Sequence, residues 1–402
     1  MSAGRHRGFA LLFTSQTISA TSDFMGPAAL TLAIVGHDGQ STALGLVLGC
    51  GLLAKIIVLP VGGVLADRLD PRRVAVAAGL LRVGTQAGIG VALLDEAPRF
   101  PLIALLQFIA GGAAGCAFPA VWPLVVELAP KERRQRANAL LGTARSVALL
   151  FGPGLAGILT LTLGPSAAFF LDAAGFAIST VLLAMVRARP ARAPGRMGRP
   201  KVLAGWAEAR EGWAEVRARR WYWTTLVAHA AWNFASGVLL TVGPVVVTGS
   251  LGGQGVWIVM VQAGGAGLLL GSLLAGRVNV RRPILMGNLG LACYAVPLVL
   301  LAARAPAPWL IVAYASALAL LGLMEPIWDN AVQALVPTRA LARLTAYDLM
   351  LSLSAQPVGL TLGPAVAAAA GTALPLFAAS AVVSVTCVVA ALIPENRRVV
   401  LP

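Results

Sequence analysis

Long apolar stretches separated by short polar segments recur along the whole 402-residue chain. Each stretch has about 20 or more predominantly apolar residues, the length that an α-helix needs to cross a hydrocarbon layer about 30 Å thick. The shorter, alternating segments of a membrane β-barrel do not occur. We therefore predict twelve membrane-spanning helices, at residues 9–35, 42–66, 74–94, 101–129, 139–161, 167–186, 224–248, 255–276, 284–303, 308–336, 346–370 and 374–394.

The second half of the chain repeats motifs of the first half. Residues 62–73 read GGVLADRLDPRR and residues 271–282 read GSLLAGRVNVRR, with six identical positions at an offset of 209. A second match, of residues 118–130 with residues 325–337, has an offset of 207. A duplicated helical bundle is the architecture of many secondary transporters, which bind substrate near the membrane midplane. We predict an all-helical membrane protein built from two pseudo-symmetric six-helix bundles.

We place the N-terminal bundle at residues 1–190, a cytoplasmic linker at 191–222 and the C-terminal bundle at 223–402. The linker begins with a segment rich in Arg, Pro and Gly, which is typical of a flexible connection. From about Lys201 it can form a basic amphipathic helix at the inner membrane surface. This helix either only joins and anchors the two bundles or has a regulatory role.

Composition and charge support the membrane assignment. The chain is 58% hydrophobic and 12% charged, and its net charge is +15. With the N-terminus inside, all of the 31 basic residues except Lys55, Arg99 and Arg304 fall in predicted cytoplasmic segments, Arg82 and Arg145 among them. This distribution follows the positive-inside rule rather than a nucleic-acid surface. We expect a multi-pass protein of a bacterial-type inner membrane, with both termini cytoplasmic and no nucleic-acid partner.

Motifs for other functions are missing from the sequence. The four cysteines are scattered singly, so neither a metal site nor a disulfide framework is predicted. There is no P-loop, HExxH or GxSxG motif, which argues against a membrane enzyme and against direct coupling to ATP. We expect a monomeric transporter that needs no cofactor and draws its energy from a proton gradient.

Two charged residues fall deep inside predicted spans. Burying a charge in a membrane costs free energy, so such residues are candidates for a functional role. Asp23 lies about 15 residues into the first span and Lys55 about 14 residues into the second, so both are near the midplane. We expect an Asp23–Lys55 ion pair. Either movement separates the pair and lets Asp23 carry a proton, or the pair is permanent and structural.

The tenth span carries two acids, Glu325 and Asp329, on one helix face. The corresponding positions of the first half hold Phe118 and Trp122. A cavity with these aromatic rings on one side and Glu325 on the other would suit an amphipathic or cationic substrate. Glu325 is a candidate for coupling or substrate binding, and Asp329 is either a second candidate or a water-facing acid.

The seventh span carries two polar residues, His229 and Asn233, on one face. They either line a polar cavity or form hydrogen bonds that hold helices together.

A charged motif with a glycine joins the second and third spans. Its residues are Gly63, Asp67, Arg68, Asp70, Arg72 and Arg73. The motif resembles the loop signature G-x-x-x-D-R-x-G-R-R of the major facilitator superfamily, with Asp70 in place of Gly and Pro71 in place of an Arg. This variant is similar to the branch of bacterial proton antiporters that includes enterobactin and macrolide exporters.

The resemblance implies a conformational latch at the cytoplasmic rim. It places Asp67 near Asp348 and pairs an arginine of the motif with Glu127, the acid that ends the fourth span. The alternative is that these residues are solvated loop charges.

The fifth span carries Gly152, Pro153 and Gly157, which permit a kink and close helix contact. The segment resembles the g-x-x-x-G-P-x-x-G-G signature of antiporters in the same superfamily, which implies export by exchange. Ordinary packing of small residues is the alternative. The superfamily's arginine of the fourth span is replaced by Gln107.

We therefore predict a secondary transporter that exports a small amphipathic molecule, such as a drug, antibiotic or siderophore, by proton-coupled alternating access. The alternatives are an uptake transporter or lipid flippase of the same fold and, more remotely, a membrane sensor that transports nothing.

Overall fold

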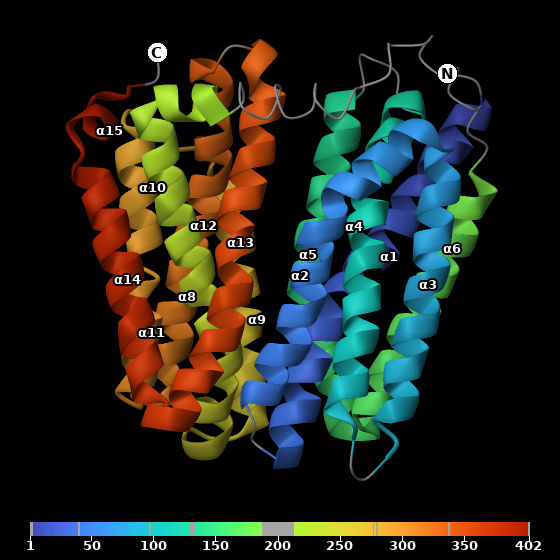
Figure 1. Ribbon diagram of the computed structural model, residues 1–402, viewed down its shortest axis with the longest axis horizontal. Helices are drawn as coiled ribbons and strands as arrows, with labels where there is room; N and C mark the ends of the chain where they lie inside the picture. Colours follow the sequence, from blue (N-terminus) through green and yellow to red (C-terminus); the bar gives the residue numbers. More distant parts are fainter. Residues whose placement is uncertain are drawn as a thin grey trace. The chain divides into compact units, whose positions relative to one another are not determined.

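The structure is a computed structural model that describes residues 3–38, 41–95, 98–128, 134–186, 213–275, 277–278, 280–336 and 338–400 (Figure 1). Within these ranges every regular element is a helix, as predicted. The helices are α1 (Ala3–Asp38), α2 (Ser41–Arg68), α3 (Pro71–Ala92), α4 (Phe100–Leu128), α5 (Arg134–Leu163), α6 (Pro165–Met185), α8 (Arg220–Ser250), α9 (Gln254–Ala275), α10 (Pro283–Ala292), α11 (Ala295–Ala302), α12 (Ala307–Leu335), α13 (Thr338–Ala370), α14 (Ala373–Leu392) and α15 (Pro394–Arg398).

The chain forms two compact units, residues 1–196 and 197–402. The described residues contain twelve helical segments that are long and apolar enough to span a membrane, six in each unit. One of them, Pro283–Ala302, combines the short helices α10 and α11. The prediction of a twelve-helix membrane protein is confirmed.

Each unit contains a pair of helices that pack backbone to backbone at glycine. In the N-terminal unit, a Cβ atom on Gly62 of α2 would meet the backbone of α4 at Gly115. In the C-terminal unit, a Cβ atom on Gly271 of α9 would meet the backbone of α12 at Ala319. Gly62 and Gly271 are equivalent positions of the sequence repeat. Small residues that allow such approach are the usual means of packing helices in membranes.

The departures from the loop signature have a local explanation. Asp70 is the N-cap of α3, and its carboxylate accepts a hydrogen bond of 3.0 Å from the backbone N–H of Arg72. Pro71 occupies the first helical position, where its missing N–H costs nothing. Where the superfamily signature has Gly and Arg, this chain thus has a residue that caps α3 and a residue that begins it.

The linker is described only from residue 213 onwards. Residues 213–218 are helical and pack on the C-terminal unit. Val216 is fully buried in a cluster with Tyr222 and Leu344, and the Trp213 ring lies 5.8 Å from that of Tyr347. The earlier part of the predicted amphipathic helix lies outside the described residues.

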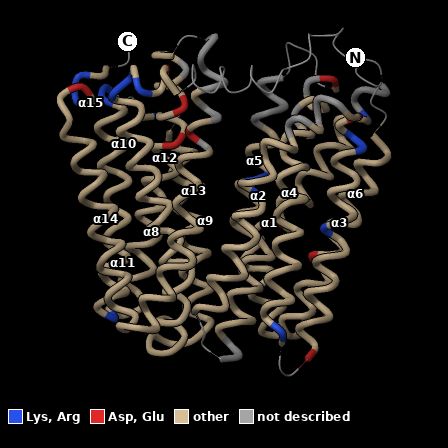
Figure 2. The backbone as a smooth tube through the Cα atoms, in the orientation of Figure 1, with Lys and Arg blue, Asp and Glu red and all other residues tan. Residues whose placement is uncertain are grey.

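Charged residues are sparse along the middle of each unit and gather at one end of its helices (Figure 2). A few charged residues nevertheless lie between the helix ends of the N-terminal unit (Figure 2). They surround a cavity within this unit.

Candidate functional site

A cavity of about 430 Å³ lies within the N-terminal unit. Side chains of α1 to α6 line it, and four of them are charged: Asp23, Lys55, Arg82 and Arg145. The apolar part of the wall includes Phe118. The cavity is large enough for a small molecule, and its mixture of apolar walls and few polar groups is typical of a binding site.

Asp23 pairs with Arg82, not with Lys55 as predicted. The Arg82 Nη2 atom donates to the Asp23 Oδ1 atom in a charge-assisted hydrogen bond. Asp23 and Arg82 lie near the middle of their spans, 7–35 and 71–92. The sequence interpretation assigned Arg82 to a cytoplasmic segment, and that assignment is wrong: α3 begins at Pro71, which places Arg82 eleven residues inside it.

The two partners of this ion pair differ in exposure. The Arg82 side chain is 11% exposed, whereas the Asp23 side chain is 46% exposed, so the acid is open to the cavity and the base is held by the protein. The Arg82 guanidinium stacks on the ring of Phe176, 3.7 Å from its centroid. Such stacking holds the guanidinium in place without neutralising it.

A second acid, Asp172 of α6, lies close to the same arginine. Asp172 is 1% exposed, and neither of its carboxylate oxygens has a partner of ordinary hydrogen-bond geometry among the described residues, although the Ser22 hydroxyl is near. The charges of Arg82 and Asp23 both act on it. The Nε atom of Arg82 is also buried without a partner in the described structure. Arg82 therefore binds one acid, Asp23, and interacts electrostatically with a second, Asp172.

Lys55 and Arg145 complete the charged lining. The charges of Asp23, Arg82 and Arg145 all act on Lys55. No hydrogen bond or ion pair joins Lys55 or Arg145 to another residue of the described ranges. Arg145 was assigned to the cytoplasm from the sequence, but it lies within the span 140–163 and faces the cavity.

Sequence reasoning missed three charged residues at or beside this cavity: Arg82, Arg145 and Asp172. Counting from the helix-starting prolines Pro71 and Pro165 places Arg82 and Asp172 well inside their helices, and this signal was present in the sequence. Of the predicted pair of aromatic residues, Phe118 lines the cavity, and the side chain of Trp122 lies outside the described part of the chain.

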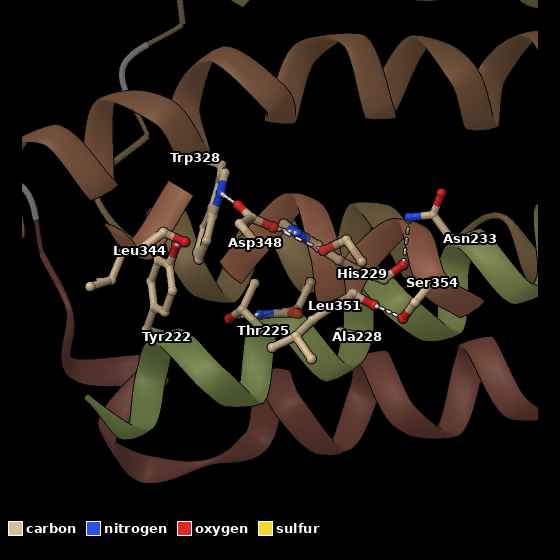
Figure 3. Close-up of polar contacts among 12 residues, drawn as sticks. Tyr222, Thr225, Ala228, His229, Asn233, Trp328, Leu344, Asp348, Leu351 and Ser354 are labelled. Atoms are coloured by element: carbon tan, nitrogen blue, oxygen red, sulfur yellow. Dashed lines mark hydrogen bonds and ion pairs between the residues drawn. The ribbon is translucent and has the colours of Figure 1, made fainter. Parts of the chain in front are cut away.

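The C-terminal unit holds a compact polar cluster around Asp348 (Figure 3). The Asp348 carboxylate accepts hydrogen bonds from Trp328 Nε1 at 3.2 Å and from Ser352 Oγ at 2.8 Å. His229 Nδ1 lies 3.6 Å from Asp348 Oδ1, and the His229 ring meets the Trp328 ring edge to face. Burial raises the pKa of Asp348, but its interactions with His229, Ser352 and Trp328 outweigh burial and hold the pKa below its ordinary value.

Three of the predicted polar residues, Asp329, Glu325 and His229, lie near one another in this unit. Asp329 lies within the electrostatic reach of Asp348 and His229. Glu325 and His229 both line a cavity of about 40 Å³, about the space for a single water molecule. Asn233 instead donates a hydrogen bond of 3.0 Å to the backbone oxygen of His229, one turn earlier in the same helix (Figure 3).

The loop motif is described only in part. The side chains of Gly63, Asp67 and Arg68 lie outside the described residues. Arg72 donates a hydrogen bond of 3.0 Å to the backbone oxygen of Val186, and Arg73 lies 3.8 Å from Asp70. Neither arginine pairs with Glu127 in the described structure, so only the pairing of Glu127 with Arg68 stays a prediction, as does the latch of Asp67 with Asp348.

The signature of the fifth span packs α5 on α1. A Cβ atom on Gly152 would come within 3.0 Å of Phe24 Cβ and of the backbone oxygen of Thr21. α5 continues through Pro153, and Gly157 is buried. This geometry accounts for the glycine by close packing, and the role of the segment in exchange stays a prediction.

Comparison with known proteins gives the same picture. The model of the Major Facilitator Superfamily matches residues 12–356. The chain is 26% identical over 404 residues to the multidrug efflux pump Tap of Mycolicibacterium fortuitum, with 96% of each chain covered. It is 27% identical to an uncharacterized MFS-type transporter, y4rN, of Sinorhizobium fredii, covering 90% of this chain and 87% of that protein.

Solved transporters share the fold. A POT family transporter in complex with a thioalcohol-conjugated peptide has a TM-score of 0.75 at 13% identity, with 95% of each chain covered. A bacterial homologue of the human lysosomal transporter Spinster has a TM-score of 0.72 at 16% identity, covering 99% of this chain and 98% of that one. At these identities the likeness shows the fold alone. The family match over most of the chain shows that this protein belongs to the Major Facilitator Superfamily and is a secondary transporter, not an enzyme.

Proposed function

We propose that this protein exports a small amphipathic molecule across the inner membrane by alternating access, in exchange for protons. The observation that carries the proposal is the Asp23–Arg82 ion pair at membrane depth beside a cavity of substrate size. Ionisable groups in that setting are costly and are retained chiefly at ion or substrate pathways.

The unequal exposure of the pair suggests how a proton acts. Asp23 is the member open to the cavity, so it is the one that a proton from the cavity can reach. Protonation removes the charge of Asp23 and weakens its hold on Arg82, because an ion pair becomes a hydrogen bond from a charged guanidinium to a neutral acid. Asp172, on which the charge of Arg82 also acts, is then the other acid toward which the guanidinium can be drawn. Loss of the proton from Asp23 restores the first pairing.

Export rather than uptake is favoured by the relatives of the chain. The Mycolicibacterium fortuitum protein, which matches along nearly its whole length, is named a multidrug efflux pump. The glycine–proline segment of α5 resembles the antiporter signature and favours the same direction. The gathering of basic residues at one end of the helices is consistent with both termini being cytoplasmic (Figure 2).

Proton flux in proteoliposomes tests the proposal. The full chain is reconstituted with a pH-sensitive dye inside, and a panel of amphipathic drugs and siderophores is added. We expect wild type to show substrate-dependent proton flux, and we expect Asp23→Asn and Arg82→Gln each to lower it at least tenfold. Glu395→Gln, which changes an exposed acid of α15, is the matched control.

Two results would contradict the proposal. Proton flux that persists in both variants would remove the ion pair from the mechanism, and Glu325→Gln would then test the other acid. Substrate movement without any proton flux in wild type would favour facilitated uptake or lipid movement.

A further inference from the structure

The charges that line the cavity of the N-terminal unit do not balance. Among the described lining residues, three of the charged side chains are basic and one is acidic. Because Asp23 binds Arg82, the positive charges of Lys55 and Arg145 remain. Asp172 is a further acid nearby, but it is 1% exposed, does not line the cavity and interacts with Arg82.

Lys55 and Arg145 lie within electrostatic reach of each other, and each acts on the other as a like charge. Neither forms a hydrogen bond or ion pair with a described residue. Lys55 is partly buried and Arg145 is exposed where it lines the cavity, and two like charges inside a protein cavity repel more strongly than in bulk water. An anion between the two side chains would relieve this repulsion.

We propose that the cavity binds an anionic group of the transported molecule, a carboxylate, sulfonate or phosphate, between Lys55 and Arg145. The guanidinium of Arg145 suits a planar carboxylate through two parallel N–H donors, whereas Lys55 supplies a point charge. This inference rests on the proposed function and specifies its substrate class.

The rest of the lining fits the apolar body of such a molecule. Phe24, Phe118 and Val121 line the same cavity, and the Arg145 guanidinium lies 6.0 Å from the centroid of the Phe24 ring. Charged and aromatic groups are thus next to each other, as recognition of an aromatic or amphipathic anion requires.

The sequence suggested an amphipathic or cationic substrate for a cavity lined by Glu325, but a cation fits this cavity, whose described lining does not include Glu325, poorly. It would meet two unpaired positive charges, and the one acid in the lining is already bound to Arg82. The charges of the described lining therefore select against cations and for anions.

Binding of a matched series of probes tests the proposal without any need for transport. The purified full chain is placed in phosphatidylcholine nanodiscs, and 4-phenylbutyrate, 4-phenylbutanol and 4-phenylbutylammonium are titrated by calorimetry. We expect the anion to bind at least tenfold more tightly than the alcohol and the cation. Lys55→Gln and Arg145→Gln should each weaken anion binding about tenfold, as loss of one charged hydrogen bond does.

Three controls keep the result interpretable. Arg281→Gln removes an exposed arginine of the C-terminal unit and should leave anion binding unchanged. Lys55→Arg keeps the charge and should retain most of the binding. The apparent Tm of each variant shows whether it is folded, and empty nanodiscs give the contribution of the lipid.

The anionic group could belong to a soluble molecule or to a lipid headgroup, and added phosphatidylglycerol separates the two. If the lipid occupies the site, its addition weakens 4-phenylbutyrate binding in wild type more than in Lys55→Gln. An equal effect in both proteins identifies a soluble anion as the ligand.

Equal or tighter binding of the cation would overturn the proposal, as would an anion preference that survives both single substitutions. Absence of the anion preference with proton flux intact would leave the proposed function standing. An anion preference without proton flux would contradict the proposed proton exchange and leave the anion site standing.

Discussion

In the N-terminal unit, a cavity of about 430 Å³ is lined by two basic side chains that form no hydrogen bond or ion pair with a described residue, beside an ion pair that is open at its acidic end. In the C-terminal unit, the acid Asp348 is held by His229, Trp328 and Ser352, and the cavity beside His229 is about 40 Å³. The cavity of the first unit thus presents positive charge without a bound acid, whereas Asp348 of the second unit is held by polar partners.

The helix packing of the two units is much more alike than their charges. The equivalent glycines Gly62 and Gly271 bring equivalent helix pairs together in both units. The positions around them have diverged: Phe118 of the first half lines the large cavity, and its counterpart Glu325 lines the small one. Positions where helices touch tolerate few substitutions, because a larger side chain must displace the neighbouring backbone. Positions that line a cavity are free of this constraint and can differ between the two halves.

The largest expected effect comes from the shared packing. Gly62→Leu and Gly271→Leu should each destabilise the protein by about 3 kcal/mol, because the new side chain must push a neighbouring backbone away. The apparent Tm in detergent measures this. Gly84→Leu and Gly249→Leu are matched controls, since a Cβ atom there meets nothing within 4 Å. If only one unit responds, the packing of the two units is not equivalent.

A smaller effect is expected from the satisfied acid of the C-terminal unit. Asp348→Asn should destabilise the protein by about 2 kcal/mol at pH 7, because charge-assisted hydrogen bonds become neutral ones. The folded-state pKa of Asp348 lies below its ordinary value of 3.8, so its stabilisation is present above 3.8 and is lost as the pH falls through the folded-state pKa. The difference in apparent Tm between wild type and variant should therefore shrink in acid.

His229 and Asp329 face Asp348 and remain in both proteins, and because they interact electrostatically with Asp348, the change in acid reports the carboxylate together with these two neighbours. Glu395→Gln, at an exposed acid of the same unit, should show little change at any of these pH values. A difference between Asp348→Asn and wild type that stays constant down to pH 3 would contradict the assignment.

The smallest expected effect comes from one donor of the same cluster. Trp328→Phe keeps a ring against His229 but removes the N–H that donates to Asp348, and should cost about 1 kcal/mol in stability. Trp309→Phe, in the same helix at a side chain that is 67% exposed, serves as the control. Equal shifts of the apparent Tm in the two variants would mean that the hydrogen bond contributes nothing.

Much of the fold follows from the sequence alone. The twelve spans, the two similar halves and the close-packed glycines are all visible in it, because a helix must be about 20 apolar residues long to cross a bilayer and must satisfy its own backbone hydrogen bonds there. The depth of a charged residue also follows from counting along its helix. By that count Arg82 and Asp172 lie inside α3 and α6, although the sequence interpretation assigned Arg82 to the cytoplasm and passed over Asp172.

The partner of each charge was decided only by the tertiary structure. Asp23, Lys55 and Arg82 lie in three helices at similar depths, so the sequence offered two bases for one acid and the interpretation chose the wrong one. Depth is a property of one helix and can be read from its residues. The choice of partner depends on which face each helix turns toward its neighbours, and that rotation is set by the packing of all the helices of the unit together.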